Sequence, residues 1–557
     1  MSAATPPAAA TAATAATAAT AERPHIVLVM ADQLSAPFLS LYGHPVVRTP
    51  RLAALARESV VFDSAYCNFP ICAPSRASML AGRMPHALQV WDNASELRAE
   101  VPTMAHYLSA AGYRTVLAGK MHFVGPDQLH GFHERLTTDI YPAEFLWVPD
   151  WSQGPGHKPT GVGMGHVVDA GPSLRNMQID YDEEVAHVAV QRIWDLARAE
   201  GRGVAPPHFL TVSFTHPHPP FVAPQAHWDR YEGVEIDPPR VPEIPYEQLD
   251  PHSQWLYLAH GQDRHRITPA HVQRARRAYY AMASYVDEKI GLVLDALAQS
   301  GLASRSLVVF CADHGEMMGE RGMWFKQTFY EPSVRVPLVV RWPGVTRPGR
   351  RNGPCSLVDL LPTFLDAAAG AAAGPDAPGE EGRPRGVRVE PVDALDGRSL
   401  LPVLQGASGH GADVVSEYSS EGVCAPSRML RRGPHKLIFT LGLPPMLFDL
   451  DHDPLELQDL AGDPAHAELL ATLLARLQAD WDAQAVDASI RASQRRRLFL
   501  RQLGLARGEF PAWSWEARPG DRARFVRPAT AGGAVGPKPR MRYPFVPPTP
   551  PDSTPQG

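Results

Sequence analysis

The sequence predicts an α/β protein with a large, mostly parallel β-sheet flanked by helices, a smaller C-terminal antiparallel sheet and an extended C-terminal arm. Short apolar, β-branched runs such as His25–Ala31 and Ser306–Ala312 alternate with helical patterns, which is typical of a parallel sheet covered on both faces. After residue 370 the composition changes to Ala, Gly and Pro, which separates the smaller sheet from the larger one. With 557 residues, 44% of them hydrophobic, the chain can form one large core with an appendage.

The first elements of the large sheet have clear signals. His25–Ala31 is expected to be a buried strand that ends on Asp32, and Thr49–Glu58 a helix with a Thr cap and Pro at its first position. The pattern then repeats along the chain. Further strands are predicted near Val60–Ala65 and at Thr115–Ala118, His208–Phe214 and Ser306–Ala312, and further helices over Pro102–Ala111, Asp182–Arg198 and Pro269–Ala298.

Beyond the large sheet, three strands and one helix are expected. They are Val414–Tyr418, Arg428–Arg432, His435–Thr440 and the helix Ala465–Ala485. The predicted domains are a disordered Ala/Thr-rich tail (1–22), a catalytic α/β domain (23–370), a linker or surface loop (371–396), a small subdomain (397–487), a basic arm (488–527) and a Pro/Gly-rich tail (528–557). The arm carries ten Arg against three acidic residues between Arg491 and Arg527. It is either a solvated helix face or an arm that docks on the acidic body of its own or a neighbouring subunit.

Composition excludes several classes of function. The formal net charge of −6 argues against a nucleic-acid partner, because binding a polyanion needs an excess of basic residues. No apolar run approaches the roughly 20 residues of a membrane helix. Residues 1–21 contain no charged side chain and so lack the basic start of a secretory signal. We therefore expect a cytoplasmic protein without a membrane partner, with a cleaved signal as the alternative.

Hard ligands follow two of the predicted strands. Asp32 and Gln33 end the first strand, and Asp313 and His314 end the strand Ser306–Ala312. Ligands of α/β sheets bind beyond the carboxyl ends of the strands. Together these residues offer two carboxylates, an amide oxygen and an imidazole, a set suited to Ca²⁺, Mg²⁺ or Mn²⁺. Each pair alone is also compatible with a simple helix cap or turn.

A nucleophile is predicted at Cys72, in the run Cys72-Ala-Pro-Ser-Arg76-Ala-Ser-Met-Leu80-Ala-Gly82-Arg83. This run resembles the signature of the type I sulfatases of the alkaline phosphatase superfamily, Cys-x-Pro-Ser-Arg followed by Leu-x-Gly-Arg. The resemblance extends over about residues 24–525 and implies an alkaline-phosphatase-like fold. It also implies that a maturation enzyme oxidises Cys72 to formylglycine, whose hydrated aldehyde attacks sulfur and later expels sulfate.

The resemblance assigns further roles. Lys120 would hold a sulfate oxygen and His122 would remove a proton to release sulfate. His216 and Lys326 would face the leaving oxygen and the other sulfate oxygens, with His218 able to exchange roles with His216. The metal ligands implied are Asp32, Gln33, Asp313, His314 and the modified Cys72, and Arg76 would join the metal in stabilising the attacking oxygen.

Two departures from the commonest sulfatase pattern indicate the subfamily. Asp32-Gln33 replaces Asp-Asp, and Asp313-His314 replaces Asp-Asn; choline sulfatases and phosphonate monoester hydrolases share this variant. Four longer runs and the arm sequence Ser493-Gln-Arg-Arg-Arg497 are similar to choline sulfatases, in which such an arm reaches into a partner subunit. The four runs are Phe62–Pro70, Met121–Phe132, Leu136–Ala143 and Ile179–Glu184. A homo-oligomer, dimer or tetramer, is therefore expected.

A trimethylammonium group needs an aromatic face and a carboxylate, because it donates no hydrogen bond. Trp147 is the first candidate for the aromatic face, and Glu421 or Glu417 for the carboxylate. Asn93 is expected to hydrogen-bond the sulfate or the diol. The segments Gly161–Ser173 and Trp513–Glu516 differ from the choline sulfatase pattern and are expected to line the same pocket.

The expected function is hydrolysis of a small alkyl sulfate, choline sulfate first, at a divalent metal and a formylglycine. A phosphonate or phosphate ester hydrolase is the alternative within the superfamily, and a non-catalytic choline-ester binding protein with unmodified Cys72 is the alternative of another class. A second Cys-Ala-Pro-Ser-Arg at Cys424–Arg428 lacks the Leu-x-Gly-Arg continuation and is not expected to be modified. Cys67, Cys311 and Cys355 are expected to be reduced core thiols.

Overall fold

The computed structural model describes residues 23–157, 161–203, 205–370, 388–411 and 413–508. The predicted N-terminal tail, most of the predicted linker, and the part of the arm and tail from residue 509 onward lie outside the described residues. The predicted linker, arm and C-terminal tail therefore stay predictions wherever they fall outside these residues.

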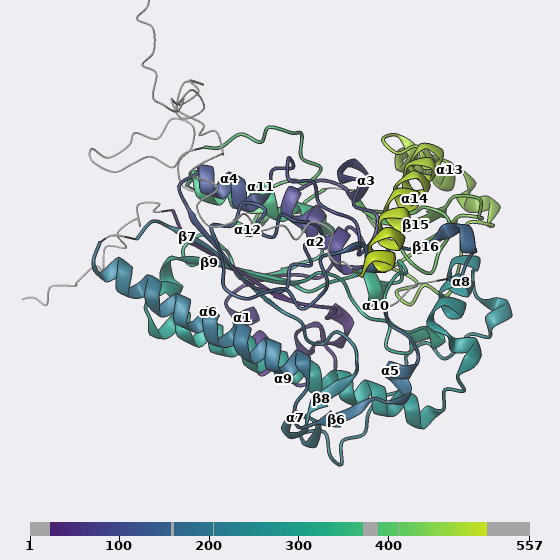
Figure 1. The fold of residues 1–557 in the computed structure, drawn as a ribbon, viewed down its shortest axis with the longest axis horizontal. Coiled ribbons are helices and arrows are strands. Elements are labelled where there is room, and N and C mark those ends of the chain that lie inside the picture. Colours follow the sequence, from purple (N-terminus) through teal and green to yellow (C-terminus); the bar gives the residue numbers. More distant parts are fainter. Residues whose placement is uncertain (1–22, 158–160, 204, 371–387, 412, 509–557) are drawn as a thin grey trace, which may run out of the picture.

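An eight-stranded mixed sheet forms the centre of the molecule (Figure 1), with the order β11-β2-β10-β9-β1-β7-β4-β5. Its strands are β1 (His25–Ala31), β2 (Val60–Phe62), β4 (Arg114–Gly119), β5 (Glu134–Arg135), β7 (His208–Phe214), β9 (Ser306–Ala312), β10 (Leu338–Arg341) and β11 (Gly349–Arg351). The central strands β9, β1, β7 and β4 are parallel, and all residues of β1, β7 and β9 are buried. The predicted mostly parallel sheet is confirmed; β10, which was not predicted, runs antiparallel to β9 and β2.

Helices cover both faces of this sheet (Figure 1). On one face α9 packs against α6 and α1, and on the other α11 packs against α4 and α2. These helices are α1 (Pro50–Arg57), α2 (Cys72–Ala81), α4 (Met104–Ala110), α6 (Met177–Gly201), α9 (Pro269–Gln299) and α11 (Leu360–Ala369). The other α-helices described before the small sheet are α3 (Pro85–Leu88), α5 (Gly165–Val168), α7 (Gln225–Asp229), α8 (Pro251–His260), α10 (Glu331–Val334) and α12 (Leu401–Leu404). None of the helices in the described part of the chain has the length and hydropathy of a membrane span.

Most predicted elements of this domain agree with the structure to within two residues at each end, and two differ by more. The strand predicted near Val60–Ala65 is two strands, because the chain leaves the main sheet after Phe62 and β3 (Ala65–Tyr66) pairs with β12 (Cys355–Ser356). Helix α6 begins earlier than predicted, at Met177, where the Asn176 side chain accepts the N–H of Ile179. A second two-stranded pair joins β6 (Gly171–Ser173) to β8 (Val222–Pro224).

The C-terminal antiparallel sheet is confirmed and has a fourth strand that was not predicted. Its order is β13 (Val414–Tyr418), β14 (Ser427–Arg432), β15 (His435–Thr440) and β16 (Met446–Asp449). The single helix predicted over Ala465–Ala485 is wrong: α13 (Ala467–Gln478) covers the small sheet, and α14 (Ala483–Arg507) starts anew. The new start follows from Asp482, whose carboxylate caps the N–H groups of Gln484 and Ala485. The boundary predicted after residue 487 thus falls inside α14.

Candidate active site

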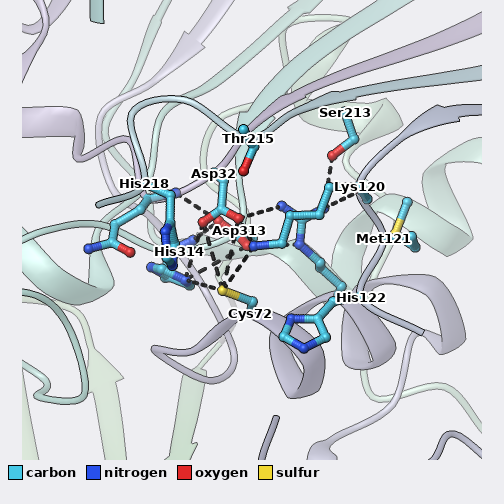
Figure 2. Close-up of polar contacts among 12 residues, drawn as sticks. Asp32, Cys72, Lys120, Met121, His122, Ser213, Thr215, His218, Asp313 and His314 are labelled. Atoms are coloured by element: carbon cyan, nitrogen blue, oxygen red, sulfur yellow. Dashed lines mark hydrogen bonds and ion pairs between the residues drawn. The ribbon is translucent and has the colours of Figure 1, made fainter. Parts of the chain in front are cut away.

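The predicted site residues converge because their strands are neighbours. Strands β9, β1, β7 and β4 are adjacent and parallel, so their carboxyl ends share one edge of the sheet. Asp313, Asp32 and Lys120 directly follow β9, β1 and β4. Figure 2 shows these side chains around Cys72, which comes from α2.

Cys72 is the first residue of α2, at the positive end of that helix. Its Sγ lies 3.2 Å from Nε2 of His314, 3.3 Å from Nζ of Lys120 and 3.8 Å from Oδ1 of Asp32. Burial raises the pKa of the Cys72 thiol to about 12. As an ordinary cysteine this side chain is therefore protonated and weakly nucleophilic at neutral pH.

The residues present fit a divalent cation. Asp32, Cys72, Asp313 and His314 are buried, and one ligand atom of each lies within 4.8 Å of the others. Gln33 joins this group, since its backbone N–H donates to Oδ1 of Asp313 over 3.0 Å. Two carboxylates with an imidazole and a nearby amide oxygen match the preferences of Ca²⁺, Mg²⁺ and Mn²⁺.

Buried cations surround the carboxylates. Nε of Arg76 donates to Oδ2 of Asp313 over 2.8 Å, and its Nη1 donates to the carbonyl of Lys120 over 2.7 Å. Burial acts to raise the pKa of Asp313, but Arg76, His314 and Lys120 outweigh it and hold that pKa below its usual value. Lys120 pairs with Asp32 and Lys326 donates to Oε1 of Gln33. Burial lowers the pKa of Lys120 to about 7.

A cavity of about 360 Å³ opens over Cys72. Six predicted site residues line it: Cys72, Asn93, His122, Trp147, Lys326 and Glu421. Of the two segments expected to line the pocket, Gly161–Ser173 does so through Gly161, Val162 and His166. The other, Trp513–Glu516, lies outside the described residues. Neither ring nitrogen of His122 has a hydrogen-bond partner among the described residues, and burial lowers the pKa of His122 to about 3.

His218, and not His216, lines the cavity. The His216 ring is fully buried, and its Nδ1 lies 2.7 Å from a carboxylate oxygen of Asp182. That carboxylate also accepts the backbone N–H of His216, which holds the residue in place beside α6. Nδ1 of His218 lies 2.6 Å from the carbonyl of Pro219 and 2.9 Å from the hydroxyl of Tyr141. The structure thus places His218, and not His216, on the cavity wall; which of the two faces the leaving oxygen stays a prediction.

Glu421, and not Glu417, is the carboxylate of the cavity. Nε2 of Gln327 donates to Glu421 over 3.1 Å, and the Ser420 hydroxyl donates to it as well. Glu417 is committed elsewhere: it accepts the backbone N–H of His86 over 2.9 Å and lies 3.4 Å from Nε of Arg428. Of the two carboxylates left open by the sequence, the structure places Glu421 within reach of a ligand.

Sequence reasoning missed several residues in or beside the cavity, among them Tyr141 and Gln327. Tyr141 lines the cavity; its ring lies 5.3 Å from that of Trp147, and Nζ of Lys120 lies 4.2 Å from its centre. Gln327, beside Lys326, joins Glu421 to His260. A signal existed for Tyr141, which lies in the run Leu136–Ala143, whereas Gln327 follows Lys326 without a motif of its own.

The repeated Cys-Ala-Pro-Ser-Arg motif lies apart from the site. Cys424 precedes β14 and does not line the cavity. Arg428 of this motif is buried within β14 and donates to Asp480 over 2.6 Å. None of the five cysteines, all within the described residues, forms a disulfide, and Cys67, Cys311 and Cys355 are buried.

Three comparisons bear on the identity of the fold and site. The family model described as Sulfatase matches residues 24–371. A choline-sulfatase of Rhizobium meliloti (strain 1021) is 41% identical over 511 residues, which cover 91% of this chain and 96% of that protein. Arylsulfatase K of Homo sapiens is 27% identical over 466 residues, 79% of each chain. Among solved structures, a phosphonate monoester hydrolase from Silicibacter pomeroyi has a TM-score of 0.63 and 26% identity, covering 81% of this chain and 94% of that one.

Proposed function

Because this chain belongs to the sulfatase family and is an enzyme of the sulfate-ester hydrolase class, we propose that its substrate is choline sulfate, which it hydrolyses to choline and inorganic sulfate. The proposal is supported by the 41% identical relative named choline-sulfatase and by the alkaline-phosphatase-like α/β fold that carries the site.

One observation carries the choice of substrate: a single cavity holds groups for both ends of a zwitterion. Lys326, with Lys120 behind it, lies beside Cys72 and attracts a sulfate anion. Trp147 and Tyr141 supply aromatic faces and Glu421 supplies a carboxylate, the combination that binds a quaternary ammonium. A sulfate ester with a cationic head group uses all of these residues.

The proposal includes two cofactors, one divalent cation and a formylglycine at position 72. Asp32, Gln33, Asp313 and His314 would hold one divalent cation, which supplies Lewis-acid stabilisation of charge on oxygen. Formylglycine at position 72, made by a maturation enzyme, would supply the oxygen nucleophile that a buried thiol does not. The cytoplasmic location and the homo-oligomer remain predictions.

The side chains around the cavity have separate tasks. The ammonium groups of Lys120 and Lys326, 3.3 and 3.8 Å from Sγ of Cys72, bind sulfate oxygens and stabilise charge that develops on them. Arg76 neutralises Asp313 and fixes the strand ends. His122, kept neutral by burial, accepts a proton. His218 faces the leaving oxygen, and Tyr141 orients its ring.

A second candidate is hydrolysis of a phosphonate monoester. The structural neighbour from Silicibacter pomeroyi is named for that activity, and a tetrahedral phosphorus anion uses the same cations. Its alcohol has no positive charge to pair with Glu421. The substrate comparison below separates the two.

Mass spectrometry of tryptic peptides tests the nucleophile. In protein matured in its native host, the Cys72 peptide should be lighter than the cysteine form by about 18 Da, the difference between CH₂SH and CHO. The Cys424 peptide, with the same local motif, is the internal control and should keep its thiol. An unmodified Cys72 in active protein would contradict the proposed nucleophile.

Substrate turnover tests the function itself. The matured enzyme should hydrolyse choline sulfate with a higher kcat/KM than para-nitrophenyl sulfate or phenylphosphonate monoesters. Chelation should remove this activity, and addition of Ca²⁺, Mg²⁺ or Mn²⁺ should restore it. A preference for the phosphonate would establish the second candidate, and full activity after verified metal removal would exclude the metal.

A further inference from the structure

Helix α14 turns polar side chains toward the body of the protein. Gln494 and Arg497 are 3% and 7% exposed, and Arg491 is half-buried. Positions 491, 494 and 497 lie about one turn apart and so share a face of the helix. The helix follows the small sheet (Figure 1) and lies well beyond residues 24–371, which match the family model.

The innermost contact leads to the N-terminus of α2. Nη1 and Nη2 of Arg497 donate to the two carboxylate oxygens of Asp92 over 2.6 and 2.8 Å, and Asp92 is fully buried. Asp92 also accepts the N–H of Ala94 over 2.9 Å, which closes the turn around Asn93. Oδ1 of Asn93 accepts the N–H of Ala73 over 2.9 Å. Ala73 is the residue directly after the nucleophile position.

The contacts of Gln494 and Arg491 lead to the two cavity walls that carry Trp147 and Glu421. Oε1 of Gln494 accepts the N–H of Trp151 over 3.1 Å, and the Arg491 guanidinium lies 5.3 Å from the centre of the Trp151 ring. Nε1 of Trp151 donates over 3.1 Å to the carbonyl of Ser420, the residue before Glu421. Arg491 also donates to the carbonyl of Cys424 over 2.8 Å. Helix α14 therefore reaches the segment after Trp147 and the loop that carries Glu421.

We propose that the contacts of α14 with the body of the protein hold three cavity walls in position, those of Asn93, Trp147 and Glu421. Arg497 is the main positioning residue of this helix. The inference rests on the proposed function only for what the cavity binds. The physical reason is that a bidentate Arg–carboxylate pair fixes direction as well as distance, and that loss of Arg497 would leave Asp92 buried without its partner. The turn that holds Asn93 would then move, and the N-terminus of α2 would lose its cap.

Arg497→Met in the full-length, matured enzyme is the main test. A displacement of reacting groups by about 1 Å costs up to about 100-fold in rate, so kcat/KM is expected to fall by about 10- to 100-fold. Arg496→Met, one residue earlier on the exposed face of α14, is the control and should stay within about twofold of wild type. Arg497→Lys keeps the charge without the fork and should give an intermediate loss.

Hydrogen exchange supplies a readout independent of substrate. In Arg497→Met, the Ala73 amide and residues 91–95 should exchange faster, while strands β1 and β9 stay protected. If the exchange rates of these amides are unchanged, or if kcat/KM of Arg497→Met matches that of Arg496→Met, the proposed positioning role of α14 is wrong. If Arg497→Met does not fold, Arg497→Lys decides by the same two measurements. Failure of wild type to hydrolyse choline sulfate would refute the proposed substrate and leave the exchange result valid.

Discussion

Four residues of the site hold a left-handed backbone that residues other than glycine rarely adopt. They are Gln33 (φ 62°), His122 (φ 60°), Phe325 (φ 67°) and Gln327 (φ 81°). Each lies within two residues of Asp32, Lys120 or Lys326. Such conformations persist where the surroundings hold them. Asp139, for example, accepts the N–H groups of Met121 and His122 over 3.0 and 2.7 Å.

The position of His218 on the cavity wall predicts that this histidine, rather than His216, protonates the leaving oxygen. Burial, together with Lys326 and Lys120, holds the pKa of His218 well below its usual value, and a sulfate anion bound beside it raises that pKa again. His218→Asn should therefore lower kcat for choline sulfate by about 10²- to 10⁴-fold. The loss for para-nitrophenyl sulfate should be much smaller, because its leaving group needs no proton.

His216→Asn is the matched comparison. It removes the contact with Asp182 and should lower the free energy of unfolding by about 1–3 kcal/mol with kcat/KM of the folded enzyme nearly unchanged. Equal losses for the two substrates in His218→Asn, or a larger catalytic loss in His216→Asn, would contradict the proposed role of His218.

At the scale of elements, the spacing of two parallel strands positions Lys120. Gly119, the last residue of β4, pairs with Ser213 of β7. A Cβ at position 119 would lie 2.0 Å from the carbonyl oxygen of Ser213, and the φ of Gly119 is +103°. The next N–H, that of Lys120, donates to the same oxygen over 2.9 Å. The strands approach this closely only because residue 119 has no side chain.

Gly119→Ala should therefore damage both stability and catalysis. Left-handed strain and overpacking together are expected to lower the free energy of unfolding by about 2–5 kcal/mol. Because β4 must move away from β7, Lys120 moves from Cys72 and kcat should fall. Gly301→Ala is the control, with φ +79° and open space around its Cβ; it should cost about 1–2 kcal/mol and leave kcat unchanged. Chemical denaturation and steady-state kinetics give both numbers.

At the scale of the whole molecule, the sheet has a catalytic edge and an opposite, amino-terminal edge that contributes to pH stability. His25 and His208 begin β1 and β7, and their ring centres lie 6.1 Å apart. Burial lowers the pKa of His208 to about 4, although the Pro206 carbonyl acts in the opposite direction. Burial likewise lowers the pKa of His25, against the effect of Glu200.

These histidines predict a loss of stability in mild acid. The unfolded chain binds protons at these positions near pH 6.5, while the folded state binds the His208 proton only near pH 4. Stability is therefore complete above pH 6.5 and falls as the pH drops toward 4, by up to about 3 kcal/mol for His208. His208→Gln should flatten this decline in urea unfolding measured between pH 7.5 and 4.5. His187→Gln, on the exposed face of α6, should keep the wild-type slope; an unchanged slope in His208→Gln would refute the assignment.

Much of the fold was predictable because its signals are local. The runs that form β1, β7, β9, β13 and β15 were predicted to the residue. A short apolar, β-branched run between turns indicates a strand without information from the rest of the chain. Strands β10 and β16 were missed, because four-residue segments such as Leu338–Arg341 and Met446–Asp449 carry too little pattern. The break between α13 and α14 depends on one capping side chain, that of Asp482.

The sequence by itself determined the family and predicted the nucleophile position and the strand-end ligands, because these reside in short motifs with fixed spacing. Only the tertiary structure decided which member of the pairs His216/His218 and Glu417/Glu421 lines the cavity. Each pair lies two to four residues apart in irregular chain or at a strand end, so a small change in backbone direction decides which side chain meets the cavity. The contact of Arg497 with Asp92 joins residues 405 positions apart, and no local pattern specifies such a pair.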